Sequence, residues 1–350
     1  MIDGGSESRP WRRHALFAAG AIALAATLPR PAAAAESFAG KTVTIYVPVG
    51  PGGGYDTYAR LVGRHIRKYL PGQPTVIVKN MPGAGGIILA AHLYTAAAKD
   101  GTEFAVLQDA NLFEQLTTNQ RLPYDARKFG YLGALEKFVP MVLAWHTTQF
   151  RRFEDTKTQS MTVGSDGPGS PSDYYPRVLN AFFGTKFKVV RGYKGSADIT
   201  LAIERGELDG YSAWCYDCMK SQRPDWLANN KARVLLQLAL EGGAELDARA
   251  VPKVIDLART TEEKQVSGFA FSGVSIARPF VAPPGLAPAR LATLREALEA
   301  TVKDPEFVED AKRGQNNIRF TAAPRMEEII ARTYATDPAV VQKVRSLMAE

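Results

Sequence analysis

Residues 47–66, VPVGPGGGYDTYARLVGRHI, place four glycines where a predicted strand meets a predicted helix. The first backbone N–H groups of a helix have no partners within the helix, and the helix dipole adds partial positive charge there. Glycine allows positive φ and lets a ligand approach without meeting a Cβ atom. The chemistry that this arrangement favours is the binding of an anion by backbone N–H groups.

The segment after these glycines has the spacing of an amphipathic helix. Tyr58, Val62 and Ile66 recur every four residues and fall on one face, with basic residues elsewhere. Asp56 or Thr57 is the expected N-cap, because both side chains can accept a hydrogen bond from the first turn. The glycines are therefore expected to lie directly at a helix N-terminus.

Three later segments repeat the order of strand, small-residue loop and helix. Their loops are expected at residues 80–86, 165–172 and 191–196. Strands that alternate with helices predict parallel sheets, and ligands of such sheets lie beyond the carboxyl ends of the strands. The four loops are therefore expected to face one cleft.

Two segments are expected to connect two lobes. Residues 137–150 are predicted as a strand that leaves one lobe for the other, and residues 265–280 as a long returning strand. The expected lobes are 36–140 with 266–350, and 141–265. The predicted fold class is α/β, with two mostly parallel sheets and a ligand cleft between two lobes that close on each other.

Residues 1–35 have the pattern of a secretory signal peptide. A segment with three arginines precedes an apolar run at 15–28, and small residues precede Glu36. The apolar run is shorter than the ~20 residues that span a bilayer, and no later segment approaches that length. We expect export to the periplasm, with an uncleaved membrane anchor as the alternative.

Composition narrows the partners. The chain has 350 residues, 45% hydrophobic and 23% charged, with a formal net charge of +7. A modest basic excess suits a small organic anion. The basic residues are spread over several predicted helices rather than clustered, so nucleic-acid binding is not indicated.

Motifs for cofactors and catalysis are missing from the sequence. The loop does not fit G-x-G-x-x-G, because the sixth residue is Tyr55 counting from Gly50 and Thr57 counting from Gly52. No G-K-[ST] follows the glycine loop at the distance that a nucleotide-triphosphate loop needs, and neither H-E-x-x-H nor G-x-S-x-G occurs. We therefore expect no cofactor, no metal and no enzyme activity, with a secreted hydrolase or thiol-redox enzyme as the alternative.

The two cysteines, Cys215 and Cys218, stand in WCYDCMK. In an oxidising compartment this spacing fits a disulfide, a redox centre or half of a metal site. No second Cys/His pair has zinc spacing, and Pro224 interrupts the helix that a thioredoxin-like centre needs. A local disulfide is the favoured interpretation, with free thiols and redox catalysis left open.

The sequence resembles the extracytoplasmic solute receptors of tripartite tricarboxylate transporters, the Bug family. The matching segments are VPVGPGGGYDTYARL, NMPGAGGIILAAHLY, KDGTEFAVLQ, GSDGPGSPSDYY, YKGSADITLAIERGELDGYSAW and ARPFVAPPGLAPARLATLREAL. The resemblance implies a periplasmic Venus-flytrap fold that holds a small carboxylate, such as a di- or tricarboxylate or an aromatic acid, between its lobes. It also implies a monomer that serves the membrane subunits of a transporter, or a sensor kinase.

By position, the resemblance implies ligand-binding residues from all four loops. They are Gly53, Gly54, Tyr55, Asp56, Gly83, Ala84, Gly85, Ser165, Gly169, Ser170, Tyr193 and Gly195. Asp56 is interpreted as the helix cap, since its carboxylate would repel an anionic ligand. Two departures from the family pattern are Tyr55, where the family often has Ser or Thr, and the segment 212–226.

Overall fold

The computed structural model describes Met1 and residues 37–136 and 139–347. The predicted signal peptide, 1–35, lies outside these residues apart from Met1. Residues Ala35–Glu350 form one compact unit, and all that follows concerns that unit.

The first sheet has six strands in the order β11-β4-β10-β3-β1-β2. They are β1 (Thr42–Val47), β2 (Thr75–Asn80), β3 (Glu103–Val106), β4 (Gly130–Glu136), β10 (Ala277–Ala282) and β11 (Thr321–Ala322). β1 is parallel to β2 and β3, whereas β10 is antiparallel to β3 and β4, and β11 is antiparallel to β4.

The second sheet has five strands in the order β7-β6-β8-β5-β9. They are β5 (Pro140–Trp145), β6 (Met161–Ser165), β7 (Phe187–Arg191), β8 (Gly210–Cys215) and β9 (Ala232–Gln237). β6 is parallel to β7 and β8, and β5 is antiparallel to β8 and β9. The α/β class is confirmed, but both sheets are mixed rather than mostly parallel. β5 and β10 are the first strands that the chain forms after it passes from one sheet to the other, and both are antiparallel to their neighbours.

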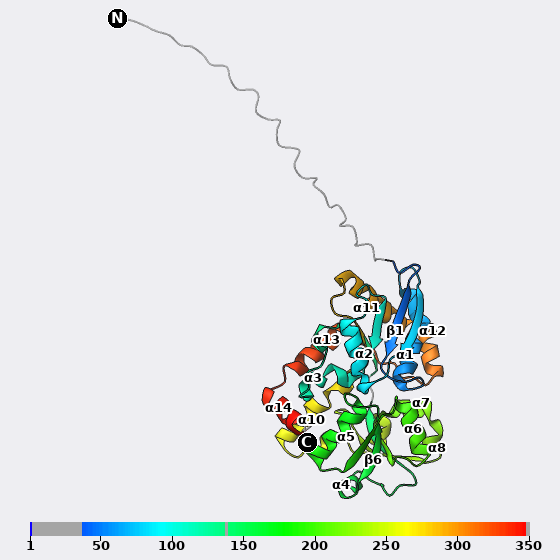
Figure 1. The fold of residues 1–350 in the computed structure, drawn as a ribbon, viewed down its shortest axis with the longest axis vertical. Coiled ribbons are helices and arrows are strands. Elements are labelled where there is room, and N and C mark those ends of the chain that lie inside the picture. Colours follow the sequence, from blue (N-terminus) through cyan, green and yellow to red (C-terminus); the bar gives the residue numbers. More distant parts are fainter. Residues whose placement is uncertain (2–36, 137–138, 348–350) are drawn as a thin grey trace. The chain divides into compact units, whose positions relative to one another are not determined.

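Helices cover both sheets, and the elements of the two lobes occupy the upper and lower parts of Figure 1. With the first sheet lie α1 (Gly54–His65), α2 (Ile87–Thr95), α3 (Glu114–Thr117), α11 (Pro288–Lys303), α12 (Pro305–Arg313) and α13 (Ala323–Tyr334). The remaining helices are α4 (Asp155–Thr158), α5 (Pro171–Phe183), α6 (Ser196–Glu204), α7 (Tyr216–Gln222), α8 (Pro224–Ala228), α9 (Ala244–Ala248), α10 (Thr261–Ala270) and α14 (Pro338–Leu347). Short 3₁₀ turns are η1 (Ile66–Tyr69), η2 (Ala84–Gly86), η3 (Asp109–Leu112), η4 (Ala126–Lys128), η5 (Val254–Leu257) and η6 (Ser272–Ile276).

The predicted amphipathic helix is α1, and its apolar face fills the core of the first lobe. Tyr58, Leu61 and Val62 are buried against Ile45 and Val47 of β1. Fully burying each such side chain contributes about 1.5–3 kcal/mol. The same packing fixes the N-terminus of α1, with its glycines, at the carboxyl end of β1.

The first crossing is where the sequence predicts it, and the second differs. The chain passes from β4 to β5, so a strand of the second sheet begins at Pro140 within the predicted segment 137–150. Most of 265–280 is not a strand, because α10 and η6 occupy it and only β10 re-enters the first sheet. Helix α10 is held by a capping box in which Thr260 and Glu263 bond reciprocally to each other's backbone N–H.

The C-terminal helix α14 lies beside α10 in Figure 1 and contacts α10, α3 and α5. Val344 of α14 is buried in the same apolar cluster as Phe269 and Phe271, which belongs to the second sheet. Helix α14 therefore packs against the apolar cluster of the second sheet. The predicted lobe boundaries at residues 140 and 266 stay a prediction.

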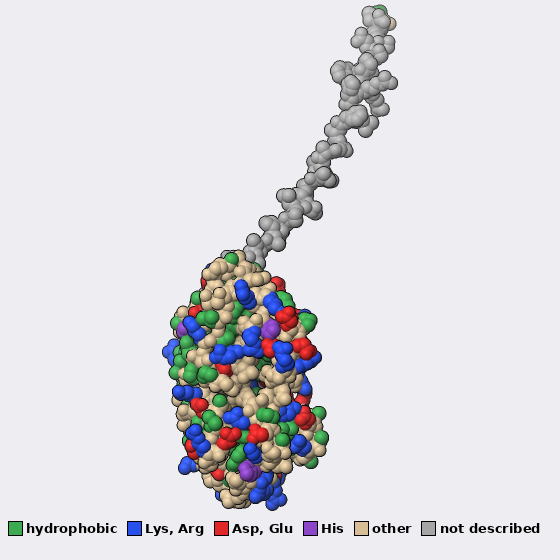
Figure 2. All heavy atoms as spheres, turned by 90° about the vertical axis from the view of Figure 1, so that its right-hand side faces the viewer, with side chains coloured by type: hydrophobic (Ala, Val, Ile, Leu, Met, Phe, Trp, Pro, Cys, Tyr) green, Lys and Arg blue, Asp and Glu red, His purple; other side chains and the backbone are tan. Residues whose placement is uncertain are grey.

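The distribution of surface charge and the length of the helices can be compared with the needs of nucleic-acid binding and of membrane crossing. Figure 2 shows Lys and Arg side chains interspersed with Asp and Glu over both lobes on the face it displays. That face is not the continuous basic surface that nucleic-acid binding requires. Within residues 37–136 and 139–347, no helix has the length and apolar character needed to cross a membrane.

Candidate ligand-binding site

The four glycine-containing loops meet in pairs across the two lobes. The N–H of Gly50, in the first loop, donates to the carbonyl oxygen of Lys194, in the fourth, at 2.6 Å. The N–H of Gly85, in the second loop, donates to the carbonyl oxygen of Asp166, in the third, at 3.2 Å. The structure therefore has the lobes closed on each other, with loops of one lobe in contact with loops of the other.

The contact between the second and third loops has no room for a side chain. Gly85 has φ +58°, and a Cβ atom there would lie 2.2 Å from the carbonyl oxygen of Pro168 and 2.4 Å from the nitrogen of Ser170. The buried amide of Asn111 joins the two loops by donating to the carbonyl oxygens of Gly85, at 3.0 Å, and Gly169, at 2.8 Å. Glycine at position 85 is thus required by closure of the lobes.

Gly54 is closely approached by a charged side chain of its own lobe and by a sulfur atom of the other lobe. It is the first residue of α1, and a Cβ atom there would lie 2.5 Å from Nη2 of Arg278 and 3.1 Å from Sγ of Cys218. Since the helix begins with Gly53 as its N-cap, the prediction of Asp56 or Thr57 as N-cap is wrong. The helix begins earlier than predicted because glycines place its first turn directly against the opposite lobe.

A cavity of about 50 Å³ lies between the first, third and fourth loops. It is lined by Val49, Gly54, Tyr55, Gln108, Asp166, Pro171, Ser172, Gly195, Ser196, Tyr211, Ala213, Trp214, Cys215 and Arg278. One water occupies about 10–15 Å³ on this measure, so the closed cavity has room for about four waters. A ligand enclosed by this closed form is therefore compact.

Three of the residues implied by the family resemblance line this cavity: Gly54, Tyr55 and Gly195. The others do not line it: Gly53, Asp56, Gly83, Ala84, Gly85, Ser165, Gly169, Ser170 and Tyr193. Gly85 and Gly169 form the loop–loop contact, and Ser170 caps α5 by accepting from the N–H of Asp173. Whether these residues bind ligand stays a prediction.

Asp56 points into its own loop. Its carboxylate accepts from the N–H of Gly52 at 2.9 Å, from Nε of Arg60 at 2.9 Å and from Nδ2 of Asn80 at 2.8 Å. These bonds hold the pKa of Asp56 below its usual value, although burial opposes them. Asp56 therefore stabilises the glycine loop as an anion, in line with its interpretation as a structural rather than a ligand-binding carboxylate.

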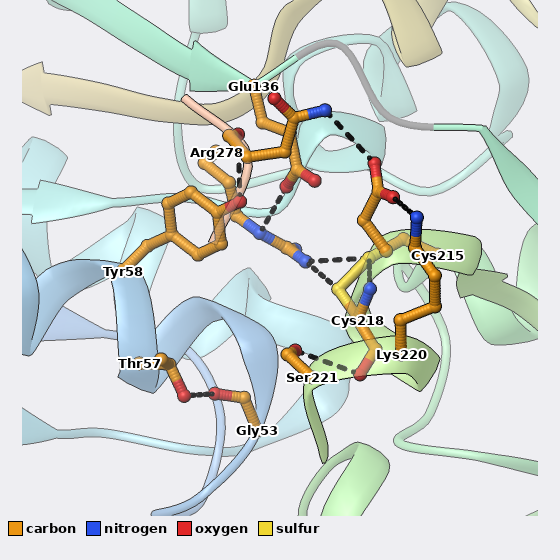
Figure 3. The surroundings of a disulfide bond; sticks show 11 residues. Gly53, Thr57, Tyr58, Glu136, Cys215, Cys218, Lys220, Ser221 and Arg278 are labelled. Atoms are coloured by element: carbon orange, nitrogen blue, oxygen red, sulfur yellow. Dashed lines mark hydrogen bonds and ion pairs between the residues drawn. A yellow bond between two sulfur atoms is a disulfide. The ribbon is translucent and has the colours of Figure 1, made fainter. Parts of the chain in front are cut away.

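The sequence reasoning missed two charged residues that line the cavity, Asp166 and Arg278, and Arg278 lies in β10. Its side chain is 5% exposed and lines the cavity, with Nε 3.3 Å from Oε2 of Glu136. Figure 3 shows the guanidinium between Glu136, the ring of Tyr58 and the two cysteines, with Nη2 3.0 Å from Sγ of Cys218. The only sequence signal was an arginine within an otherwise apolar strand, ARPFVA.

Burial shifts the pKa values of Glu136 and Arg278 and so affects the charge that each side chain carries. It raises the pKa of Glu136 to about 7, although the positive charge of Arg278 opposes the rise. Burial alone would lower the pKa of Arg278, but Glu136, Tyr55 and Tyr58 raise it overall. Arg278 therefore stays positively charged, and the pair of Glu136 and Arg278 holds a net positive charge whenever Glu136 is protonated.

Tyr55 departs from the family pattern and helps to position this arginine. Its hydroxyl donates to Oδ1 of Asp109 at 2.8 Å, and the Arg278 guanidinium lies 4.1 Å from its ring centroid. Such a cation–π contact contributes about 2 kcal/mol where it is desolvated. The ring is turned inward, where it narrows the cavity.

The comparison with known families decides the class of protein. The model of the "tripartite tricarboxylate transporter family receptor" matches residues 58–346. The chain belongs to this family. Its members are substrate-binding receptors of the periplasm rather than enzymes, as the sequence predicts.

Relatives of this receptor have been described and solved. An Agrobacterium vitis protein, "UPF0065 protein in the TAR-I ttuE-ttuC' intergenic region", is 29% identical over 93% of this chain and 87% of its own length. The periplasmic binding protein BugD has TM-score 0.69 at 19% identity, covering 88% of this chain and 98% of its own. MatC from Rhodopseudomonas palustris, solved with bound malate, has TM-score 0.64 at 20% identity, covering 88% and 96%. A second R. palustris protein, solved with adipate, has TM-score 0.65 at 16% identity, covering 88% and 97%.

This receptor carries a disulfide at the cavity wall. Cys215, the last residue of β8, is bonded to Cys218 in α7, with 5.1 Å between the Cα atoms. Of the interpretations that the sequence left open, the structure therefore has the local disulfide. It lies against the Arg278 guanidinium, as Figure 3 shows.

We expect the exported receptor to show no reactive thiols when it is unfolded without reductant, and two after reduction. Replacing both Cys215 and Cys218 by serine should lower the free energy of unfolding by about 2 kcal/mol, the entropy of closing so short a loop. Thiol titration and urea denaturation measure the two effects. Two thiols titrating before reduction would contradict the disulfide.

Proposed function

We propose that this chain captures a small carboxylate in the closed cleft and delivers it to the membrane subunits of a tripartite tricarboxylate-type transporter. The observation that carries the proposal is a cavity, enclosed by loops of both lobes, with the buried Arg278 in its wall. The malate and adipate in two neighbours of the same fold support a carboxylate ligand.

The donors at the cavity suffice for such a ligand. The N-terminus of α1 at Gly54 and Tyr55 offers unpaired N–H groups, and the Arg278 guanidinium offers charge. A hydrogen bond to a charged group contributes about 1.5–3 kcal/mol. About four of them supply the ~8 kcal/mol of micromolar affinity.

Closure links binding to delivery. The contacts of Gly50 with Lys194 and of Gly85 with Asp166 exist only when the lobes meet. A ligand that touches both lobes therefore stabilises the closed form relative to an open one, by its difference in affinity for the two. The closed form is then the signal that a membrane subunit recognises.

A panel of ligands tests the proposal by thermal shift. We expect at least one small carboxylate, among di- and tricarboxylates, aromatic acids and amino acids, to stabilise the receptor by about 2.7 kcal/mol at 100 times its Kd. Uptake of that ligand by cells with and without the receptor gene then separates transport from sensing. The proposal is wrong if no carboxylate stabilises the protein, or if it turns over an ester or disulfide substrate instead.

A further inference from the structure

The cavity is bordered by two opposite charges that come from different lobes. Arg278 belongs to β10 of the first sheet, and Asp166 directly follows β6 of the second. Both charges act on the same buried phenol, that of Tyr211. Burial is the main cause that raises the pKa of Tyr211; the charge of Asp166 raises it further, and the charge of Arg278 lowers it. A cavity of about 50 Å³ therefore offers a ligand one anion and one cation at short range.

Asp166 has capacity for a cation. Its carboxylate accepts from Oγ of Ser172 at 2.5 Å and, across the cleft, from Nε2 of Gln108 at 2.7 Å. Among the described residues, no lysine or arginine nitrogen lies within 4.0 Å of it. An ionised carboxylate has about four lone-pair sites, so two remain for a further donor.

The opposite wall suits a carboxylate. Arg278 lies beside the N-terminus of α1, where a Cβ atom on Gly54 would lie 2.5 Å from Nη2. Trp214 also lines the cavity; it is 3% exposed, and its indole Nε1, a donor, has no hydrogen-bond partner. A buried donor without a partner is unfavourable, and a ligand oxygen would satisfy it.

Aromatic faces also line the cavity. The rings of Tyr211 and Trp214 stack with 5.7 Å between centroids and 21° between planes, and both residues line the cavity. Aromatic faces attract an ammonium group. A purely anionic ligand gains nothing from these faces and is repelled by the carboxylate of Asp166.

We propose that the ligand is a compact zwitterion, a small α-amino acid, with its carboxylate at Arg278 and the start of α1 and its ammonium at Asp166. This inference rests on the proposed function, since it assigns the class of carboxylate that the same cleft takes. The cavity's size excludes bulky side chains in the closed form. Gln108, by donating to Asp166 from the other lobe, couples the ammonium site to closure.

Matched ligand pairs test the inference on the unaltered receptor. Alanine and propionate, aspartate and succinate, and glutamate and glutarate each differ only by the α-ammonium group. We expect the amino acid of at least one pair to bind at least 10-fold more tightly than its partner, measured by calorimetry. Equal or tighter binding of the deaminated acids would overturn the zwitterion while leaving the carboxylate receptor intact. Failure of every member to bind would overturn the zwitterion, whereas the proposed function would be contradicted only if the wider panel of carboxylates also failed.

Two variants assign the charges, and a third is the control. Asp166→Asn should remove the preference for the amino acid, whereas Arg278→Gln should weaken both members of the pair at least 10-fold. Asp225→Asn should change neither, because Asp225 is half-exposed, pairs with Lys231 and does not line the cavity. Thermal melts establish that each variant folds. A preference that survives in Asp166→Asn would show that Asp166 only stabilises the closed loops.

Discussion

Gly85→Ala is expected to reduce ligand affinity about 100-fold or more while the protein still folds. The added Cβ would lie 2.2 Å from the carbonyl oxygen of Pro168 and 2.4 Å from the nitrogen of Ser170, both in the backbone of the opposite lobe. Backbone atoms cannot give way as a flexible side chain can, so the lobes cannot close fully. Loss of about two hydrogen bonds to a charged ligand costs about 3 kcal/mol, which is about 100-fold in Kd.

The matched control is Gly184→Ala. Gly184 ends α5 with φ +66°, close to the +58° of Gly85, and a Cβ atom there meets nothing within 4 Å. Both substitutions share the cost of positive φ, about 1–2 kcal/mol, but only one obstructs closure. Calorimetry with the most stabilising carboxylate of the panel measures both variants. Equal affinities would show that the second loop is an ordinary turn.

From the sequence alone, Gly53→Val would be expected to weaken ligand binding as much as substitution of Gly85. The structure predicts a smaller loss of affinity for Gly53→Val. A Cβ atom on Gly53 lies 3.1 Å from Oγ of Ser196, a side-chain atom, and φ at Gly53 is −82°. The sequence identifies glycines that a turn or a helix start favours. Which of them the other lobe approaches depends on closure, and that is visible only in the structure.

The loops were predictable because their signals are local. A glycine run between an apolar strand and an amphipathic helix is complete within residues 47–66, and 80–86 repeats it. The returning segment 265–280 was predicted wrongly because a short apolar run does not distinguish a strand from a buried helix. The local signal that decides it is Thr260 followed three residues later by Glu263, a capping box.

The walls of the cavity were not predictable for a different reason. Arg278 meets Glu136 only because β10 pairs with β4, and it reaches Cys218 only when the lobes close. Tyr211 and Trp214 come from β8, whose contribution to the cleft no motif indicates. The glycine motifs show where the backbone can contact a ligand. The charged side chains that face the ligand depend on the pairing of strands far apart in the sequence and on closure of the lobes.

The pH dependence of stability should reveal how the buried Glu136 is balanced against Arg278. Burial raises the pKa of Glu136 from its ordinary 4.5 to about 7. The folded protein therefore holds this proton at pH values where the unfolded chain has lost it. The resulting stability is fully present below about pH 4.5 and is lost as the pH rises through about 7. A pKa difference of about 2.5 corresponds to a loss of about 3 kcal/mol.

Glu136→Gln isolates this contribution, because glutamine has nearly the shape of the protonated acid but does not titrate. We expect the variant to match the original protein at pH 4 and to exceed its free energy of unfolding by about 3 kcal/mol at pH 8. Glu114, whose pKa burial also raises to about 7, titrates in both proteins and cancels in the difference. Urea denaturation of both proteins at the two pH values measures it. If the original protein instead gains stability over the variant at pH 8, the attraction of Arg278 outweighs the cost of burying the Glu136 charge.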